Sequence, residues 1–271
     1  MPADERSEFL NTAVTAAQSA GKIIRENLGH MSKNDISQKK ESDFVTWVDK
    51  ESERIIIETI KGRFPEHSFL AEESVHESDT GNYRWIIDPL DGTTNYIHQY
   101  PVFSVSIALE YHGERIAGVI YDPLRNDLFT AEKERGAFLT GNRIAVSPVI
   151  DLKDSLICTG FPFRQKEHID RYLMLFKNIF NRVSDMRRAG SAALDLAYLA
   201  CGRCEGFFEI GLSPWDMAAG ALMITEAGGL VTDFSGGNNY LSTGNIVAGV
   251  PVIHGELLGE IKKVFAGIIP E

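Results

Sequence analysis

The sequence has little cysteine, no long apolar run and no excess of basic residues. Its three cysteines are Cys158, Cys201 and Cys204, and only the last two stand in a C-x-x-C spacing. A zinc site would need two further ligands at a readable spacing, which the chain lacks. A thioredoxin-type redox site would rest on this spacing alone. We therefore interpret the cysteines as reduced or merely structural.

Other absences bear on where the protein acts and on what it binds. No apolar run reaches about 18 residues, so no membrane span is predicted. The start of the chain, MPADERSEFL, lacks the charged and then apolar pattern of a signal peptide, so a cytoplasmic protein is expected. The net charge of −11 argues against direct nucleic-acid binding, which needs a basic surface. The same charge is compatible with a site that gathers cations, or simply with solubility.

The apolar pattern of the chain predicts a succession of helices and strands. Helical spacing is found at residues 6–27 and 49–61, and the polar, aperiodic residues 29–43 between them predict a mobile loop. Short apolar runs separated by tight turns at residues 102–146 predict an antiparallel meander. Further on, we expect strands at 155–159 and 206–210 and helices at 167–181, 191–200 and 215–227.

These elements favour an α/β protein of layered helices and sheets, with a largely antiparallel first sheet. The 271 residues contain no Pro/Ser-rich linker, so we expect a single domain over residues 1–271. Within it we expect one lobe of about residues 1–148, with a helix pair and an antiparallel sheet. The other lobe, residues 149–271, would alternate helices and strands.

The stretch WIIDPLDGTTNYIH, which begins at Trp85, places two carboxylates at the end of an apolar run. A β-turn would account for one Asp-Gly pair. It would not account for Asp88 at the mouth of a buried strand, because no Lys or Arg lies between Trp85 and Pro101. Asp88 and Asp91 are close enough to share a cation. Without one, two charges about 4 Å apart cost about 4 kcal/mol at an effective dielectric constant near 20. Oxygen ligands suit Mg²⁺.

The next residues, Gly92, Thr93 and Thr94, open a short predicted helical turn. A helix N-terminus presents free N–H groups, which favour anions. A glycine lets a ligand approach the backbone closely. One segment therefore offers metal ligands and a phosphate cradle side by side.

Further acids have an ordinary structural interpretation beside a functional one. Glu72 and Glu73 follow a short apolar strand at residues 68–71, but exposed loop acids are common. Asp49 in TWVD and Asp216 in SPWD fit the third position of a helix-capping box. Glu209 would by default be a solvated strand residue. The residues alone leave these alternatives open.

Four motifs together resemble the inositol monophosphatase family. WIIDPLDGTTNYIH and PWDMAAGALMITEAGG resemble its two main motifs, and DFVTWVD and AEES match two further ones in the right order. The matches extend from about Asp43 to Gly229, and MRRAGSAALDLAYLACG is similar to the bacterial-type inositol-1-monophosphatases. The resemblance implies a five-layer αβαβα sandwich, of the type shared with fructose-1,6-bisphosphatases. It also implies Mg²⁺-dependent phosphomonoester hydrolysis, inhibition by lithium and a homodimer.

Carried over to this sequence, the resemblance implies metal ligands for two or three Mg²⁺ ions per active site. Glu72, Asp88 and the backbone carbonyl of Leu90 would hold one ion. Asp88, Asp91 and Asp216 would hold a second.

The resemblance also implies roles in catalysis and substrate binding. Thr93, oriented by Asp49, would position the nucleophilic water, and Glu72 would accept or order its proton. The backbone of Gly92 and Thr93 would hold the phosphate, next to Asp91. Lys39 is a candidate for a mobile-loop lysine. The polyol would contact Gly190, Ser191, Ala192, Glu209 and Asp216.

The sequence DGTTNY after the first acid is closest to the form in inositol monophosphatases, so myo-inositol monophosphate is the expected substrate. Some relatives also accept fructose 1,6-bisphosphate, which makes a fructose-1,6-bisphosphatase or another sugar or nucleotide phosphatase the alternative. A regulatory binding protein is an alternative from another class, because some bacterial relatives are implicated in assemblies with RNA polymerase. We therefore expect a phosphorylated polyol and, as a possible second partner, a transcription complex.

Overall fold

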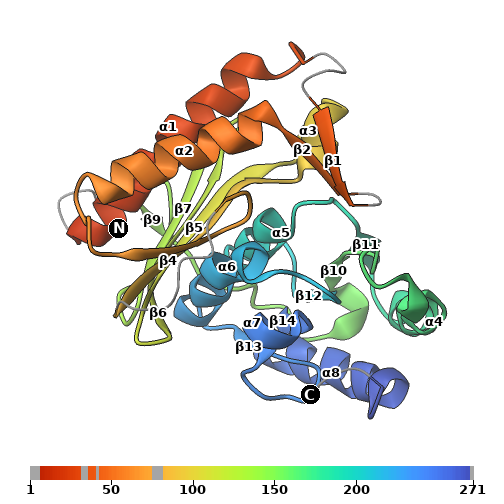
Figure 1. The fold of residues 1–271 in the computed structure, drawn as a ribbon. Helices are drawn as coiled ribbons and strands as arrows, with labels where there is room; N and C mark the ends of the chain where they lie inside the picture. The colour runs from red at the N-terminus through yellow and green to blue at the C-terminus, as the bar shows by residue number, and fades with distance from the viewer. Residues whose placement is uncertain (1–6, 32–35, 41–42, 75–81, 269–271) are drawn as a thin grey trace.

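Helices and sheets are stacked in five layers in the computed structural model of the chain (Figure 1). The structure describes residues 7–31, 36–40, 43–74 and 82–268. A helix pair, a seven-stranded sheet, a second helix pair, a five-stranded sheet and a third helix pair follow one another. This is the αβαβα sandwich that the motifs implied. The three helix pairs are α1 (Glu8–Asn27) with α2 (Trp47–Lys61), α5 (Ala192–Ala200) with α6 (Pro214–Glu226), and α4 (Ile169–Phe180) with α8 (Pro251–Phe265).

The first sheet has the strand order β3-β4-β5-β6-β7-β8-β9. β3 runs parallel to β4, and each later pair of neighbours is antiparallel. The meander predicted for residues 102–146 is therefore confirmed. The strands are β3 (Ser68–Ala71), β4 (Tyr83–Asp91), β5 (Ser104–Tyr111), β6 (Glu114–Asp122), β7 (Asp127–Glu132), β8 (Gly136–Leu139) and β9 (Asn142–Arg143).

The second sheet has the strand order β11-β10-β12-β14-β13. β11 and β12 both run parallel to β10, so the carboxyl ends of these three strands meet at one edge. β14 runs antiparallel to β12 and to β13. The strands are β10 (Leu156–Thr159), β11 (Asp185–Arg187), β12 (Gly206–Glu209), β13 (Leu230–Thr232) and β14 (Ile246–Gly249).

The elements predicted between residues 155 and 227 are found within a few residues of their expected bounds, as β10, α4, α5, β12 and α6. No element is predicted beyond residue 229. The strands β13 and β14 are runs too short for a clear period. The helix α8 is missed, although Ile253, Leu257, Ile261 and Val264 recur at helical spacing. Short helices complete the described fold: α3 (Thr93–Ile97), α7 (Tyr240–Thr243) and the 3₁₀ helices η3 (Leu152–Asp154) and η4 (Lys166–His168).

The helix α6 lies at the centre of the middle layer. Apolar clusters pack on both sides of each sheet, and the largest surrounds α5 and α6 between the two sheets. α6 is buried from Asp216 to Ile224, which explains why its sequence is apolar on all sides. Its close approach to β6 depends on Gly118, where a Cβ would lie 3.2 Å from the Cα of Ala219.

The mobile loop predicted for residues 29–43 is wrong over part of its length. Ile36–Lys40 form the strand β1, which pairs antiparallel with β2 (Asp43–Thr46). Backbone pairing satisfies N–H and C=O groups whatever the side chains are, so an aperiodic polar stretch gave no strand signal. Lys39 lies in β1, and its side chain is outside the described part of the structure.

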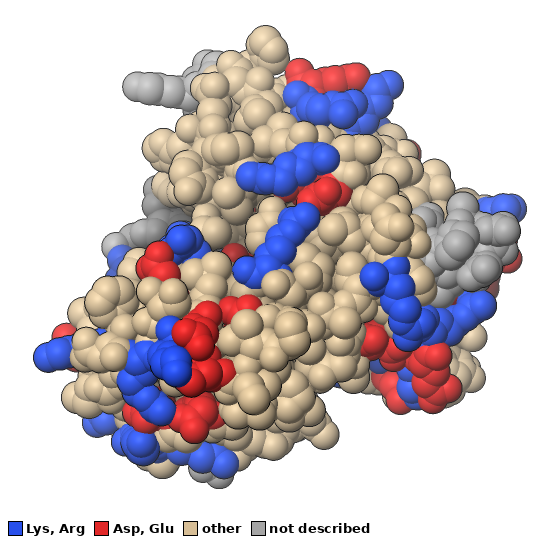
Figure 2. All heavy atoms as spheres, turned by 180° about the vertical axis from the view of Figure 1, so that it is seen from behind, with Lys and Arg blue, Asp and Glu red and all other residues tan. Residues whose placement is uncertain are grey.

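Basic and acidic side chains lie in small mixed groups on the face seen in Figure 2. On α2, Arg54 pairs with Glu51 and with Glu58, both at 2.6 Å. Exposed pairs of this kind stabilise by at most about 1 kcal/mol each. Among the helices of the described residues, none is long and apolar enough to cross a membrane.

One matched substitution at two glycines tests the packing of α6. Gly118→Ala should lower the free energy of unfolding by about 1–3 kcal/mol, because the new methyl group meets backbone atoms of α6. Gly255→Ala in α8 has open space and should raise it by about 0.5–1 kcal/mol, because alanine favours a helix. Urea denaturation of both variants measures the two changes. A neutral Gly118→Ala would contradict the close approach of α6 to β6.

Candidate metal and phosphate site

A cleft of about 270 Å³ lies where several elements end or begin. It is lined by residues at the carboxyl ends of β4, β10 and β12 and at the N-termini of α3, α5 and α6. In open α/β sheets, ligands commonly bind outside the carboxyl ends of strands. Helix N-termini favour anions. The position of the cleft alone therefore suits an anionic ligand.

Asp88 and Asp91 both reach this cleft because β4 contains a bulge. Three residues apart in a regular strand, they would point to opposite faces of the sheet. Asp88 pairs with Ser106 and Asp91 with Ser104, so β4 carries one residue more than β5 in this interval. The extra residue returns Asp91 to the side of Asp88. Pro89, which has no N–H to donate, is tolerated at such a bulge.

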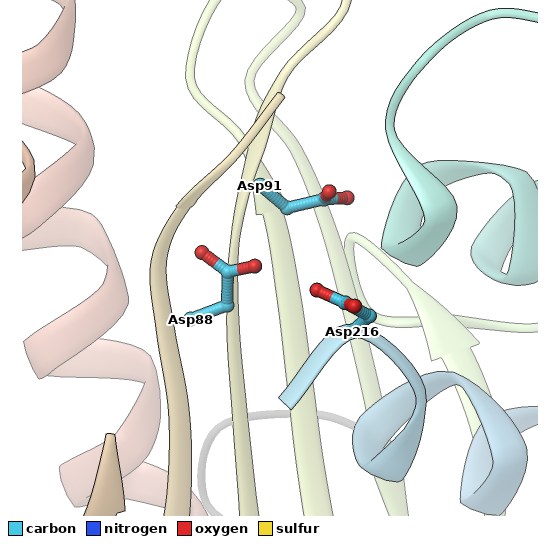
Figure 3. Close-up of side chains that lie close together, drawn as sticks. All are labelled: Asp88, Asp91 and Asp216. Carbon is cyan, nitrogen blue, oxygen red and sulfur yellow. The ribbon is translucent and has the colours of Figure 1, made fainter. Parts of the chain in front are cut away.

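Figure 3 shows Asp88, Asp91 and Asp216 pointing toward one another. One carboxylate oxygen of each residue lies within 4.8 Å of those of the other two, and all three residues are buried. Asp88 and Asp91 come from β4, whereas Asp216 comes from the first turn of α6. Glu72, just after β3, lines the same cleft.

Burial and mutual repulsion raise the pKa of these carboxyls. Burial is the largest cause for all three, and charge repulsion is the next cause for Asp88 and Asp91. For Asp216, the Arg164 guanidinium acts against burial, and the Glu72 carboxylate adds to it. The pKa of Asp91 is raised to about 7 and that of Asp216 to about 6. The pKa of Asp88 is raised well above its ordinary value. Without a cation, the cluster therefore tends to hold protons at neutral pH.

Hydrogen bonds fix two of the carboxylates and partly offset these shifts. Asp91 Oδ2 accepts the Ser191 hydroxyl at 2.5 Å and the backbone N–H of Ala193 at 2.8 Å. Asp216 Oδ2 accepts the backbone N–H of Ser213 at 2.7 Å, which supports the start of α6. The start of α5 thus holds Asp91 of β4 in place, and the start of α6 supplies Asp216.

This set of residues fits a divalent cation bound by oxygen. The Arg164 guanidinium lies 3.6 Å from Asp216, but one guanidinium does not balance three buried carboxylates. Carboxylate and carbonyl oxygens are the ligands that Mg²⁺ prefers. The predicted ligands Glu72, Asp88, Leu90, Asp91 and Asp216 all line the cleft.

Asp49 combines the two interpretations that its motif left open. Its Oδ2 accepts the backbone N–H of Thr46 at 2.8 Å and forms the capping box of α2. Its Oδ1 accepts the Thr93 hydroxyl at 2.8 Å. Burial raises the pKa of Asp49 to about 6, so it is mostly ionised at neutral pH. Because Thr93 gives its one hydroxyl proton to Asp49, its oxygen lone pairs can accept from a ligand in the cleft.

The predicted phosphate cradle forms the start of α3. Gly92 has a φ of +101°, and a Cβ there would lie 3.0 Å from the carbonyl oxygen of Val102. Only glycine suits this position without strain. Gly92, Thr93 and Thr94 all line the cleft. The first N–H groups of a helix have no acceptor within it and favour an anion.

The residues predicted to contact the polyol line the other half of the cleft: Gly190, Ser191, Ala192 and Glu209. Glu209 is buried at the end of β12, so its default interpretation as a solvated residue is wrong. It packs so closely on Gly160 that a Cβ at residue 160 would overlap its carboxylate. Burial raises the pKa of Glu209 well above its ordinary value. A buried carboxyl of this kind can hydrogen-bond a hydroxyl group of a ligand.

Three charged residues of the cleft are absent from the sequence predictions: Arg164, Arg188 and Asp195. Asp195 had a sequence signal, because it is an acid inside the apolar helix α5. The two arginines lie outside helices and strands, where no period marks them. Glu73, by contrast, is not among the residues that line the cleft; its backbone N–H donates to Glu53 at 2.7 Å.

The raised pKa values predict how the metal-free protein responds to pH. The folded state holds protons on Asp91 and Asp216 that the unfolded chain has already lost near pH 4. That stabilisation is present at low pH and is lost as the pH rises through about 6–7. In EDTA, the melting temperature should therefore fall between about pH 5 and about pH 8. Millimolar Mg²⁺ should raise it more at the higher pH, because a bound cation replaces the lost protons.

Calorimetry with NaCl of equal ionic strength as the control measures both effects. Asp91→Asn should flatten the pH dependence, because it removes one of the raised groups. A melting temperature that changes with neither pH nor Mg²⁺ over this range would count against a cation site at the cluster.

Comparison with known proteins places this arrangement in a family. The model of the inositol monophosphatase family matches residues 5–265. The chain is 49% identical over 255 residues to the Nus factor SuhB of Escherichia coli K12, covering 94% of this chain and 96% of that protein. It is 45% identical to the inositol-1-monophosphatase of Mesorhizobium japonicum, covering 95% and 97%.

Solved structures give the same result. The extragenic suppressor protein SuhB of Bartonella henselae superposes with a TM-score of 0.91 at 44% identity, covering 95% of this chain and 99% of that one. The IMPase of Thermotoga maritima superposes with a TM-score of 0.88 at 33% identity, covering 97% and 100%. The chain therefore belongs to the inositol monophosphatase family.

Proposed function

We propose that this protein is a Mg²⁺-dependent phosphatase that hydrolyses a polyol monophosphate, with myo-inositol monophosphate as the first candidate. The observation that carries the proposal is that Asp88, Asp91 and Asp216 converge in the cleft that also contains the start of α3. A phosphate bound in this cleft would then face both the cation ligands and the start of a helix that favours anions. Family membership supports the phosphatase class.

Separate groups of residues would bind the metal ions and the phosphate. Glu72, Asp88, Asp91, Asp216 and the carbonyl of Leu90 would hold Mg²⁺. Bound Mg²⁺ would supply Lewis acidity to the phosphate ester. The N–H groups at Gly92 and Thr93 would orient the phosphate.

The attacking water is positioned by side chains of this chain. Thr93 donates its hydroxyl proton to Asp49 and can accept a proton of the water. That hydrogen bond turns a lone pair of the water toward phosphorus. Glu72, at the same cleft, would accept the other proton as the water attacks. On the polyol side, Glu209 and Asp216 would accept hydroxyl groups, beside Gly190, Ser191 and Ala192.

Substitution of Asp216 tests the proposal against a purely structural role. If Asp216 only capped α6, Asp216→Asn would cost up to about 1 kcal/mol of stability and leave turnover intact. As a metal ligand, it should instead lower kcat at least about a hundredfold, since each 1.36 kcal/mol of barrier is about tenfold in rate. The metal-free variant should be as stable as the wild type or more stable, because a repelling charge is gone.

The assay compares turnover of inositol 1-phosphate and a panel of other phosphomonoesters, with and without Mg²⁺. Lithium is added in a parallel series, because inhibition by lithium belongs to the proposal. Asp151→Asn is the matched control: Asp151 caps η3 through the N–H of Lys153 at 3.1 Å and is not among the residues lining the cleft. Near-normal turnover of Asp216→Asn at saturating Mg²⁺ would contradict the assignment of Asp216 as a Mg²⁺ ligand.

We also infer that the protein associates with the transcription machinery, as the name of the Nus factor SuhB relatives suggests for them. One surface supports a protein partner. α4 exposes Leu173, Met174 and Phe180, whose exposed fractions are 47%, 55% and 53%. Leu173 and Phe180 are seven residues apart, about two helical turns, so they lie on the same face of α4. Exposed apolar patches can mark interaction sites. The homodimer that the family implies is part of the same proposal.

The two functions should separate by substitution. Asp216→Asn should abolish turnover and still co-purify with RNA polymerase complexes. Leu173→Glu should weaken that co-purification at least about tenfold and keep the folded state. Sedimentation of Leu173→Glu then reports whether α4 also carries self-association. Equal co-purification of Leu173→Glu and wild type would exclude α4 as the partner surface.

A further inference from the structure

Two basic side chains line the cleft beside its carboxylates. Arg164 follows β10 and Arg188 follows β11, so both lie at the edge where the parallel strands end. A neutral polyol needs hydrogen-bonding groups such as Glu209 and has no charge for a guanidinium to balance. The position of the two arginines therefore calls for a separate explanation.

Arg188 and its neighbour Arg187 differ in what they contact. Arg187 forms an ion pair with Asp185, and its Nη1 donates to the carbonyl of Met186 at 2.9 Å. Among the described residues, the exposed Arg188 guanidinium has no hydrogen bond and no ion pair; its carbon lies 5.8 Å from the ring centre of Phe161. Arg188 lines the cleft, whereas Arg187 is not among the lining residues. Of the two, Arg188 is the one available to a ligand.

The Arg188 side chain lies beside residues that were predicted to bind the polyol. A Cβ on Gly190 would lie 2.6 Å from Arg188 Nη1, so the guanidinium lies directly against Gly190. Its charge partly offsets the upward pKa shifts of Asp195 and Glu209, which line the same cleft. Neither acid forms an ion pair with it within the described residues.

Arg164 is already engaged at the other side of the cleft. Its Nη1 lies 3.6 Å from Asp216, and its guanidinium carbon lies 4.9 Å from the ring centre of Phe163. A planar guanidinium matches a phosphate or a carboxylate with two parallel hydrogen bonds. Arg188 is the lining arginine whose fork is not used in this way.

We propose that Arg188 binds a second anionic group of a substrate, so that, of two phosphomonoesters that differ only in a further phosphate or carboxylate, this cleft prefers the one that carries it. The inference rests on the proposed function for the site of the first phosphate. Arg188 is a specificity-determining residue in this scheme. It contacts the distal anion and takes no part in attack at phosphorus.

Pairs of esters that differ in one anionic group test this preference. Fructose 1,6-bisphosphate and fructose 1-phosphate differ in a second phosphate; 3-phosphoglycerate and glycerol 3-phosphate differ in a carboxylate. Calorimetric affinities are measured with Ca²⁺ in place of Mg²⁺ to slow turnover, and kcat and KM are measured with Mg²⁺. The wild type should prefer the doubly anionic member of at least one pair by about tenfold or more, as expected for hydrogen bonds between charged groups. The pair of esters that shows the preference identifies the second anionic group as a phosphate or as a carboxylate.

Two substitutions of Arg188 test whether this residue causes the preference. Arg188→Gln should reduce the ratio of the two affinities to about one, and Arg188→Lys should give an intermediate ratio because it keeps the charge and loses the fork. Arg187→Gln, the adjacent control, should leave the ratio and turnover unchanged. A wild-type ratio near one in both pairs, or a ratio that survives Arg188→Gln, would overturn the proposal. So would an equal loss for both members of a pair, which would mean that Arg188 only supports Glu209 and Asp195.

The outcomes distinguish the proposed anion subsite at Arg188 from the proposed phosphatase activity. A preference in binding that Arg188→Gln removes, without turnover of any ester, would reject the phosphatase and support the subsite. Mg²⁺-dependent turnover with no preference for the second anion would do the reverse. Melting curves of the Arg188 variants check that each is folded.

Discussion

Asp88, Asp91 and Asp216 place one oxygen each within 4.8 Å of the others in a part of the molecule from which water is largely removed. Like charges this close repel one another, and burial withdraws the solvent that would screen them. Such an arrangement persists only if the rest of the fold holds it, if a carboxyl keeps its proton, or if a cation binds. The hydrogen bonds from Ser191 and Ala193 to Asp91 belong to that support. The site is therefore a place where packing energy from elsewhere keeps charges together for a ligand.

Two of the site carboxylates also cap helices, and the two roles do not compete. A carboxylate has two oxygens, and Asp49 gives one to the N–H of Thr46 and the other to the hydroxyl of Thr93. In Asp216, Oδ2 accepts the N–H of Ser213. The cap holds the side chain in one rotamer, so the remaining lone pairs keep a fixed direction. A capping box can in this way also position a carboxylate of the candidate site.

The cleft exists because elements from both halves of the chain end at one place. The bulge in β4 brings two acids to one side of the first sheet, and α6 brings the third from the middle layer. α6 can approach that sheet because Gly118 and Ala219 leave room between strand and helix. The second sheet contributes Glu209, at the end of β12, and Arg188, just after β11. Small residues in the middle layer thus set the distance across the cleft.

The sequence by itself determined the elements whose signals are local. The helix at residues 6–27, the meander at residues 102–146 and the glycine before Thr93 follow from apolar period, turn residues and backbone freedom. It also marked Asp88 and Asp91 as a pair, because a charge at the end of a buried run needs a partner. For Asp49, Asp216 and Glu209 the residues alone left a capping or solvated role open, and the family motifs were needed to favour a role in the site.

Only the tertiary structure decided which of these groups meet. The contact of Asp216 with Asp88 and Asp91 joins residues distant in the sequence, so no local period encodes it. The same holds for the hydrogen bond from Ser191 to Asp91, for the burial of Glu209 and for the difference between Arg187 and Arg188. The hairpin of β1 and β2 is formed by backbone pairing, which side-chain pattern does not record. Local propensities decide where helices and strands form, but packing between layers decides which side chains share a buried cleft, and that depends on the whole chain at once.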